Sequence, residues 1–335
     1  MIKLFRKIRH DLIFQKRIGK YLLYAIGEII LVVVGILIAL NLNIKSRQRI
    51  SEAKIDAIFG NILQELSSDI YEINGLMKFY EQKDSVFKLV LNNKLTYDDY
   101  ANPPFGSLFS ATSYYDQVVL KHYAFDNLIE NIDAIPTKYN DITNQLKILY
   151  ITNLKIVEIF NEVVRENVEN NLIEREKYEW YSLEVPVNKN EGMINYFLND
   201  FRYKNKIKNF RMFGIENHLK QSLSYRNRAI QCYKKIAALL NQSTDDESFI
   251  TKKEIRDEVV GKYGLSELPD FIVYVFEEDK RLFRNTSLDS TKIEVFVLSK
   301  TKFMDENLNF STLVRKDNNI IIKTNDGLVL KKEIN

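Results

Sequence analysis

The longest apolar run of the chain lies close to its N-terminus. Residues 21–43 read YLLYAIGEIILVVVGILIALNLN and carry a single charge, Glu28. Because a helix needs about 20 mostly apolar residues to cross the hydrocarbon core of a bilayer, we predict a transmembrane helix here. A cleaved signal peptide is one alternative, and the lack of an A-x-A-like site after the run disfavours it. A buried core helix is another, and such helices rarely stay apolar for this length.

Beyond this run, apolar residues recur in steps of three and four, which is the helical period. Asn102-Pro103-Pro104, Pro136 and Val185-Pro186 interrupt the pattern. We therefore expect four helical stretches, at about 44–91, 113–135, 137–181 and 193–240. Four amphipathic helices with short connections predict an antiparallel bundle.

The last helical stretch contains two residues that depart from its pattern. Gly214 is a candidate break in the helix. The second half carries an apolar seam: Leu219, Leu223, Ile230, Tyr233, Ala237 and Leu240. Arg226 is the one polar residue within this seam.

After residue 242 the hydrophobic period changes. Residues 243–264 read as a polar linker followed by a short helix. The later apolar runs are short and rich in Val and Ile, which is typical of strands, and they lie at 271–276, 292–298, 319–323 and 328–331. Turn residues such as Asn325-Asp326-Gly327 separate them. We predict a small β-rich module over residues 265–335.

The expected fold class is therefore mainly α. An N-terminal transmembrane helix is followed by an antiparallel long-helix bundle over residues 44–242 and by the small β-rich C-terminal module. The length of 335 residues is enough for two or three domains. Cys232 is the single cysteine, so an intramolecular disulfide is excluded.

Basic residues flank the apolar run on both sides. Seven precede it: Lys3, Arg6, Lys7, Arg9, Lys16, Arg17 and Lys20. Four follow it: Lys45, Arg47, Arg49 and Lys54. Because basic residues favour the cytoplasmic side, this bias predicts a cytoplasmic N-terminus. The net charge is +3 and the chain beyond residue 20 is close to neutral, which argues against a nucleic-acid partner.

The tail over residues 1–20 has helical spacing of its apolar residues, with basic residues between them: Ile2, Phe5, Ile8, Leu12 and Ile13. This pattern favours an amphipathic helix on the inner leaflet of the bilayer. An unstructured basic tail is the alternative.

Glu28 shares one face of the predicted span with Leu31, Val32, Gly35 and Ala39. Gly35 and Ala39 form a small-xxx-small spacing, which lets a second helix approach closely. A carboxylate at membrane depth costs a few kcal/mol unless it meets a partner or the interface. We therefore predict either a helix-packing or partner-contact face, or a boundary residue that reaches the inner headgroups.

The N-terminal residues resemble the opening of an uncharacterised bacterial family of single-span membrane proteins, a domain of unknown function. The similarity is carried by Gly19-Lys20-Tyr21, Tyr24-Ala25, Gly27-Glu28-Ile29 and residues 35–39, and it extends more loosely to about residue 242. A tryptophan expected shortly after the span is missing. The resemblance implies an inner-membrane location, and it implies no activity or catalytic residue.

The sequence offers no recognisable catalytic chemistry. It contains no P-loop, G-x-G-x-x-G, H-E-x-x-H or G-x-S-x-G motif. His10, His122 and His218 are far apart, and the positions three before His122 and His218 lack the Glu of a di-iron site. We read the histidines as surface or packing residues, and Cys232 as a small buried hydrophobe. The expectation is a non-enzyme without metal or cofactor.

Trp180 lies beside Tyr178 and Tyr181, near the predicted end of the long helix. It is a candidate wall of a ligand groove. Aromatic packing at the end of the bundle is the favoured alternative, because aromatic residues dominate protein cores.

Two functions fit these features. The first is a membrane-anchored interaction or scaffold protein that presents its bundle on the periplasmic side and meets a protein partner or a second copy. The alternative is a ligand-sensing bundle that signals through a membrane partner, because only the short N-terminal tail is expected inside. The apolar run indicates the lipid bilayer as a partner. The sequence does not indicate which small molecule, if any, the protein binds.

Overall fold

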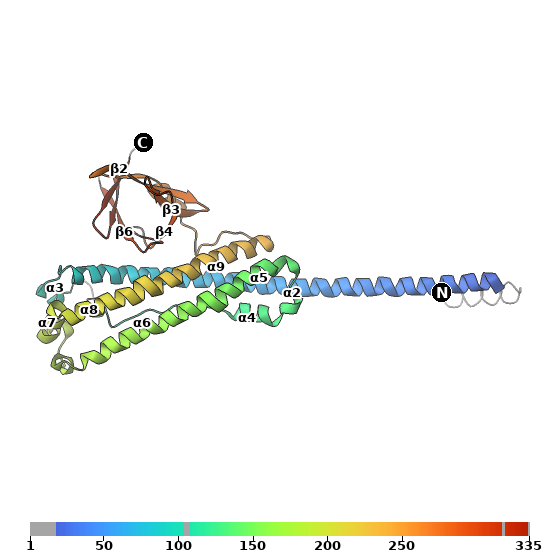
Figure 1. Ribbon diagram of the computed structural model, residues 1–335, viewed down its shortest axis with the longest axis horizontal. Helices are drawn as coiled ribbons and strands as arrows, with labels where there is room; N and C mark the ends of the chain where they lie inside the picture. Colours follow the sequence, from blue (N-terminus) through green and yellow to red (C-terminus); the bar gives the residue numbers. More distant parts are fainter. Residues whose placement is uncertain (1–17, 104–107, 317–318, 334–335) are drawn as a thin grey trace. The chain divides into compact units, whose positions relative to one another are not determined.

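The computed structural model describes residues 18–103, 108–316 and 319–333 (Figure 1). The chain divides into two compact units. One comprises Met1–Ala57 with Asn131–Pro136, and the other comprises Ile58–Glu130 with Thr137–Asn335. Of the predicted amphipathic tail over residues 1–20, residues 1–17 lie outside the described residues, and residues 18–20 belong to helix α2 (Ile18–Leu91).

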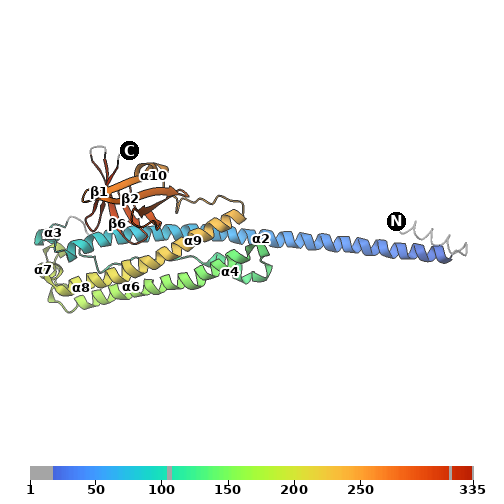
Figure 2. The same cartoon turned by 45° about the horizontal axis from the view of Figure 1, so that its top comes forward.

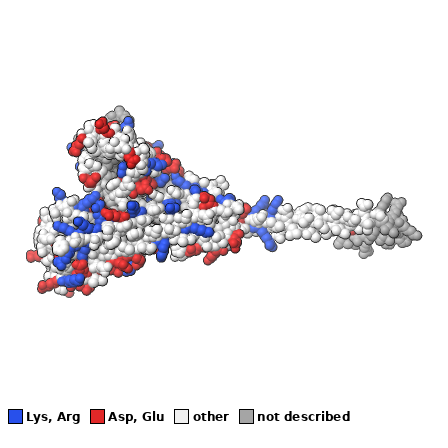
Figure 3. Space-filling view, in the orientation of Figure 1, with Lys and Arg blue, Asp and Glu red and all other residues white. Residues whose placement is uncertain are grey.

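The apolar run forms part of helix α2, which extends over Ile18–Leu91. Among the described residues, α2 is the one helix long and apolar enough to cross a membrane. Leu23 and Leu42 expose 77% and 65% of their surface, and the run has almost no charged atoms in the space-filling view (Figure 3). Such exposure of large apolar side chains suits a lipid environment and not water.

The second unit contains a helical bundle (Figures 1 and 2). Its helices are the later part of α2, α3 (Tyr97–Ala101), α4 (Tyr123–Glu130), α5 (Asn140–Lys147), α6 (Leu154–Arg175), α7 (Glu191–Asn199), α8 (Phe201–Phe210) and α9 (Lys220–Leu239). Short helical turns link them: η2 (Thr137–Tyr139), η4 (Glu179–Ser182) and η5 (Val187–Lys189). The first unit contributes the further turn η1 (Ile132–Ala134). The predicted stripe of α2 is buried from Phe59 to Phe87, as helical spacing requires.

Two wide π-helical turns interrupt the long helices. One is η3 (Ile148–Asn153), between α5 and α6, and the other is η6 (Arg211–Leu219), between α8 and α9. The predicted break at Gly214 falls inside η6, where the helix widens but continues. The helix instead ends and restarts at Asp200, whose carboxylate caps α8 by accepting from the Arg202 backbone N–H.

The predicted helix at 113–135 is mostly wrong, because only α4 and the short turn η1 are helical there. Side chains of neighbouring helices satisfy the extended backbone that precedes α4. The Asn161 amide pairs with both backbone groups of Val118, and the Asp69 carboxylate accepts from the Lys121 N–H at 2.9 Å. These bonds replace helical ones, so the sequence pattern of this segment could not identify it.

The prediction of a small β-rich module is also wrong, because the C-terminal part is a closed eight-stranded antiparallel barrel. Its strands are β1 (Gly261–Leu265), β2 (Leu268–Glu278), β3 (Arg281–Thr286), β4 (Ile293–Val297), β5 (Lys302–Asp305), β6 (Phe310–Lys316), β7 (Asn319–Thr324) and β8 (Val329–Lys332). Each pairs with the next, and β1 pairs with β8 through Tyr263 opposite Lys332. Closure leaves no exposed strand edge.

The four predicted strands correspond to β2, β4, β7 and β8. The other four were missed because they mix polar with apolar residues, as in RLFRNT of β3 and FSTLVRK of β6. In a barrel one face of each strand is outside, so such alternation is expected. The predicted turn at Asn325-Asp326-Gly327 does connect β7 to β8, with Gly327 at a positive φ of 99°.

Candidate ligand site in the barrel

The barrel contains a partly open cavity of about 440 Å³. Proteins bind small molecules in pockets of roughly 300–1,000 Å³, and an eight-stranded barrel has room for one small ligand. Alternation along the strands turns Val273, Val275, Leu282, Phe303 and Leu313 towards a common core. Most of these side chains also line the cavity, so its walls are apolar.

Polar lining residues gather at one end of the barrel, which we call the mouth. At this end β3 finishes and the turns from β5 to β6 and from β7 to β8 lie, because antiparallel neighbours place alternate turns together. The polar residues are Thr286, Asn309, Ser311, Thr324, Asn325 and Asp326. The mouth therefore suits the polar part of a ligand, and the interior suits an apolar part.

An ion pair between a half-buried arginine and a buried carboxylate stiffens the wall at the mouth. The guanidinium of Arg284 on β3 donates to the carboxylate of Asp305 at the end of β5, with Nε at 2.9 Å. The same carboxylate accepts from the backbone N–H groups of Asn307 and Asn309, which fixes the turn that follows. Since the pair is internally satisfied, it shapes the entrance without offering a free charge.

The opposite end of the barrel is covered by α10 (Lys253–Val259). Val259 is 3% exposed and belongs to the barrel core. The preceding residue, Glu258, accepts from Arg315 on β6 at 2.6 Å, and its backbone carbonyl accepts from Lys332 on β8. Helix α10 is thus attached to two strands, and its residue Val259 lines the end of the cavity opposite the mouth.

Three residues of the bundle also line the cavity: Asp84 and Lys88 of α2, and Arg211 at the start of η6. The Asp84 carboxylate is buried and accepts from Lys88 at 2.9 Å. It also accepts from the amide of Asn325 in the turn from β7 to β8, at 3.0 Å. The mouth is therefore completed by bundle residues, and a molecule in the cavity would touch both parts.

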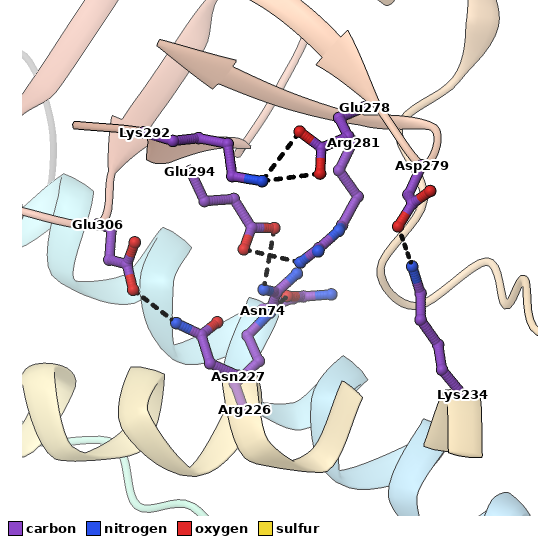
Figure 4. A network of polar contacts seen from close by, with 10 residues as sticks. All are labelled: Asn74, Arg226, Asn227, Lys234, Glu278, Asp279, Arg281, Lys292, Glu294 and Glu306. Atoms are coloured by element: carbon purple, nitrogen blue, oxygen red, sulfur yellow. Dashed lines mark hydrogen bonds and ion pairs between the residues drawn. The ribbon is translucent and has the colours of Figure 1, made fainter. Parts of the chain in front are cut away.

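A second contact joins the barrel to the bundle through Arg226 (Figure 4). Its guanidinium lies between Asn74 of α2, at 3.0 Å, and Glu294 of β4, at 3.5 Å. Glu294 also accepts from Arg281 at 3.0 Å, and the Phe296 ring lies 4.8 Å from the Arg226 guanidinium carbon. The polar residue in the predicted seam of α9 therefore marks where the barrel docks.

Weaker pairs surround this contact. Lys234 donates to Asp279 at 2.9 Å, Asn227 to Glu306 at 2.7 Å, and Lys302 to Glu81 at 2.9 Å. Burial lowers the pKa of Arg226, and the nearby Glu294 carboxylate opposes this. An exposed pair contributes little, so Arg226 with Glu294 is the part of the contact that depends most on correct docking.

The predicted membrane site residues lie together on α2, but the described residues do not test their role. Leu31 and Val32 are exposed, and a Cβ added at Gly35 would meet nothing within 4 Å. Glu28 is half-buried and Ala39 is exposed. The face formed by these five residues stays a prediction of a lipid or partner contact.

The two described histidines, His122 and His218, do not form a common site. His122 pairs with Asp126 on the surface at 2.7 Å, whereas His218 is buried and shares a hydrogen bond with the Tyr80 hydroxyl at 2.8 Å. Burial lowers the pKa of His218 to about 4, so its ring is neutral. Among the described residues, no group of three His, Cys, Asp or Glu side chains is placed to hold a metal.

Trp180 and Cys232 take structural positions. The Trp180 ring stacks with Tyr178, with 5.3 Å between the ring centroids, and it tilts against Tyr196. These contacts correspond to the aromatic packing expected at the end of the bundle. Cys232 is buried, and burial raises its pKa to about 11, so its thiol is unreactive.

Comparisons of the chain with protein-family models, with curated proteins and with solved structures found no match. The family resemblance of the N-terminal segment therefore stays a prediction. The cavity was missed in the sequence because most of its residues are spread over the C-terminal part, and three of the strands that carry them, β3, β5 and β6, were not recognised. The one available signal was the alternation within β3 and β6.

Proposed function

We propose that this protein is a membrane-anchored binding protein whose barrel holds one small, mainly apolar molecule. The observation that carries the proposal is the cavity of about 440 Å³ with apolar walls and a polar mouth. Protein interiors are otherwise close-packed, and voids larger than a water molecule are few. A pocket of this size, with apolar walls and a few polar groups at its mouth, is typical of a site for one small molecule.

A binding role fits the charges better than catalysis does. Arg284 and Asp305 are paired with each other, and Asp84 is paired with Lys88. Catalytic groups instead need a side chain that is free to exchange a proton or attack a substrate. The proposed site therefore recognises a molecule without transforming it. It also moves the ligand-sensing role, expected in the bundle, to the barrel.

For location we propose a bacterial inner membrane, with the N-terminus in the cytoplasm and the bundle and barrel in the periplasm. The seven-to-four bias of basic residues around the apolar run supports this topology. Alkaline phosphatase fused after Lys54 should then be active in a bacterial host. An inactive fusion, together with an active cytoplasmic reporter at the same position, would contradict the topology.

The binding role is tested on the full chain in lipid nanodiscs with a diazirine-bearing dodecanol as a photoreactive probe. We expect adducts on peptides of β2, β5 and β6, mapped by mass spectrometry. Val273→Phe adds a ring to the cavity and should reduce these adducts severalfold, since it fills the space the probe needs. Val329→Phe makes the same change at an exposed position of β8 and is the matched control.

Two results would overturn the binding role. The first is labelling confined to the apolar part of α2, which reports only partition into the bilayer. The second is labelling of the barrel that Val273→Phe and Val329→Phe affect equally.

A second candidate is the interaction role. Several large apolar side chains are exposed near the turn between α6 and α7: Tyr181, Leu183, Val185, Val187 and Phe201. Exposed apolar patches often mark a protein contact. Recovery of one stoichiometric protein after gentle solubilisation would support this role, and its loss in Leu183→Ser with Val185→Ser would place the contact here.

A further inference from the structure

The mouth of the cavity carries six charged residues: Asp84, Lys88, Arg211, Arg284, Asp305 and Asp326. Three are acidic and three are basic, so their sum is neutral. Recognition there is decided by which of these groups still has hydrogen-bonding capacity, because a neutral set exerts no net attraction at long range.

The three carboxylates already accept hydrogen bonds. Asp305 accepts from Arg284 and from the turn that follows β5. Asp84 accepts from Lys88 and Asn325. Asp326 accepts from the hydroxyl of Thr324. Each acid of the mouth therefore already has at least one donor, which weakens the case for a cationic ligand.

Arg211 differs from the other cations of the mouth. In the described part of the chain its one charged neighbour is Asp84, whose carboxylate lies 3.6 Å from Nε, beyond hydrogen-bond length. Nε is buried and has no hydrogen-bond partner there. The side chain is 43% exposed, so its guanidinium is reachable. A buried donor without an acceptor is unfavourable, so an acceptor that reaches this guanidinium is bound favourably.

Lys88 lies beside Arg211 through their common neighbour Asp84. Its side chain is one-third exposed, and an ammonium has three donors, of which Asp84 uses one. A carboxylate at the mouth could accept from the Arg211 fork in a bidentate way and from Lys88. The two cations outnumber Asp84 at this point, so one added negative charge balances them.

From the mouth inwards the cavity wall becomes continuously apolar. Phe271 and Leu328 lie near the entrance, Val295 and Leu313 follow, and Val259 of α10 closes the far end. Such a wall favours a hydrocarbon tail, because moving methylene groups out of water into apolar surroundings is favourable.

We infer that the ligand is an amphiphile with one carboxylate and an unbranched hydrocarbon tail. The tail occupies the barrel, and the carboxylate binds Arg211, assisted by Lys88. This inference rests on the proposed binding function and adds the class of ligand to it. Arg211 is the first residue of the π-helical turn η6, so the carboxylate binds to the bundle and the hydrocarbon tail binds in the barrel.

The experiment is competition against the diazirine-bearing dodecanol, on the full chain in nanodiscs at a pH of about 8.5, where a carboxylic acid is ionised. Dodecanoic acid and dodecanol are the competitors. We expect the acid to displace the probe at concentrations about tenfold lower than the alcohol, because a hydrogen bond to a charged group is worth more than a neutral one.

Arg211→Gln should remove this preference while leaving competition by dodecanol unchanged. Arg228→Gln, at an exposed position of α9, is the control and should keep the preference. Partition of each competitor into the bilayer is the same for both proteins, so the difference between them isolates the site. Lys88→Gln should weaken the preference to a smaller extent.

The outcomes separate the two levels of the proposal. Equal competition by acid and alcohol, or a preference that survives Arg211→Gln, overturns the carboxylate ligand and leaves the barrel as a binding site. Absence of barrel labelling by the probe, as described above, overturns both. An acid preference that is lost only in Arg211→Gln and weakened in Lys88→Gln supports the inference.

Discussion

Arg226 connects sequence, packing and assembly at the scale of a single residue. It is buried, it bonds to Asn74 and it pairs with Glu294 across the contact between α9 and β4. Removing one member of a buried ion pair leaves the other charge without its partner in a medium of low polarity. Replacing both members with apolar side chains of similar size avoids that penalty.

We therefore predict that Arg226→Met destabilises the protein by about 2–4 kcal/mol. The loss is limited because Glu294 still pairs with Arg281. Arg226→Met combined with Glu294→Met should be more stable than the single Arg226 variant. Thermal unfolding of the purified chain, followed by circular dichroism in detergent, measures both. Arg228→Met on the same helix is the control, and additive effects of the two substitutions would argue against the pairing.

Asp69 is a second buried charged residue, placed in the bundle core. Its carboxylate accepts from the Tyr225 hydroxyl at 2.7 Å and from the Lys121 N–H at 2.9 Å. Burial is the main cause that raises its pKa from 3.8 to about 7, and these hydrogen bonds oppose the rise. The folded protein therefore holds a proton that the unfolded chain has already released at neutral pH.

The sign of the pH dependence follows from this shift. A pKa that is raised in the folded state adds to the free energy of unfolding. This contribution to stability is complete below pH 3.8 and is lost as the pH rises through about 7. We predict that Asp69→Asn stabilises the protein relative to the wild type by about 1–3 kcal/mol more at pH 8 than at pH 5. Parallel melting curves of both proteins at the two pH values provide the measurement, and a constant difference would refute the assignment.

At the scale of elements, the wide turn η6 is fitted closely to its surroundings. A Cβ added at Gly214 would lie 2.7 Å from the Tyr80 ring, and the Tyr80 hydroxyl is held by His218 at 2.8 Å. The ring cannot move aside without losing that bond. The glycine is therefore required by close packing, and not by a break in the helix.

We predict that Gly214→Ala lowers the stability by about 1–3 kcal/mol through overpacking. Gly75→Ala is the matched control, because Gly75 is exposed in the middle of α2 and a Cβ there would meet nothing within 4 Å. In a helix this change should stabilise the protein by about 0.5–1 kcal/mol. Opposite shifts of the melting temperature are expected, and two shifts of the same sign would contradict the packing argument.

The elements also show what the sequence could predict. The helical stripe of α2 and the runs of β2, β4, β7 and β8 follow a strong local period, and the structure has them. The extended segment before α4 depends on Asn161 and Asp69, which are distant in sequence. The local hydrophobic period cannot reveal hydrogen bonds between distant residues. It also failed to identify β3 and β6, in which polar and apolar residues are mixed.

The candidate site illustrates the same limit. Arg226 was recognisable as a polar residue in an apolar seam, but its partner Glu294 was not. The cavity requires closure of β1 on β8, and nothing in the local pattern of either strand specifies that pairing. A face on a single helix, such as the predicted face of Glu28, can therefore be proposed from the sequence. A site formed by strands that meet only when the barrel closes cannot.

At the scale of the whole molecule, the question is whether bundle and barrel fold separately. The polar residues 243–247 lie between them, and domain boundaries tend to fall in such stretches. The barrel has its own core and a complete ring of strand pairs. When the barrel is removed, Arg226 loses Glu294 and Asp84 loses Asn325, whereas Asn74 and Lys88 of the bundle remain as their partners.

We predict that residues 51–242 form a helical domain that melts cooperatively, at a lower temperature than the same bundle within the full chain. Residues 251–335 should fold as a β protein, because closure leaves no strand edge in need of the bundle. Circular dichroism and thermal melting of the two fragments test this. Arg226→Met should recover part of the loss in the bundle fragment, since it removes a charge that the missing barrel no longer pairs. If the bundle fragment is unfolded or aggregates without residues 243–335, then barrel and bundle share one core and the two-domain interpretation is wrong.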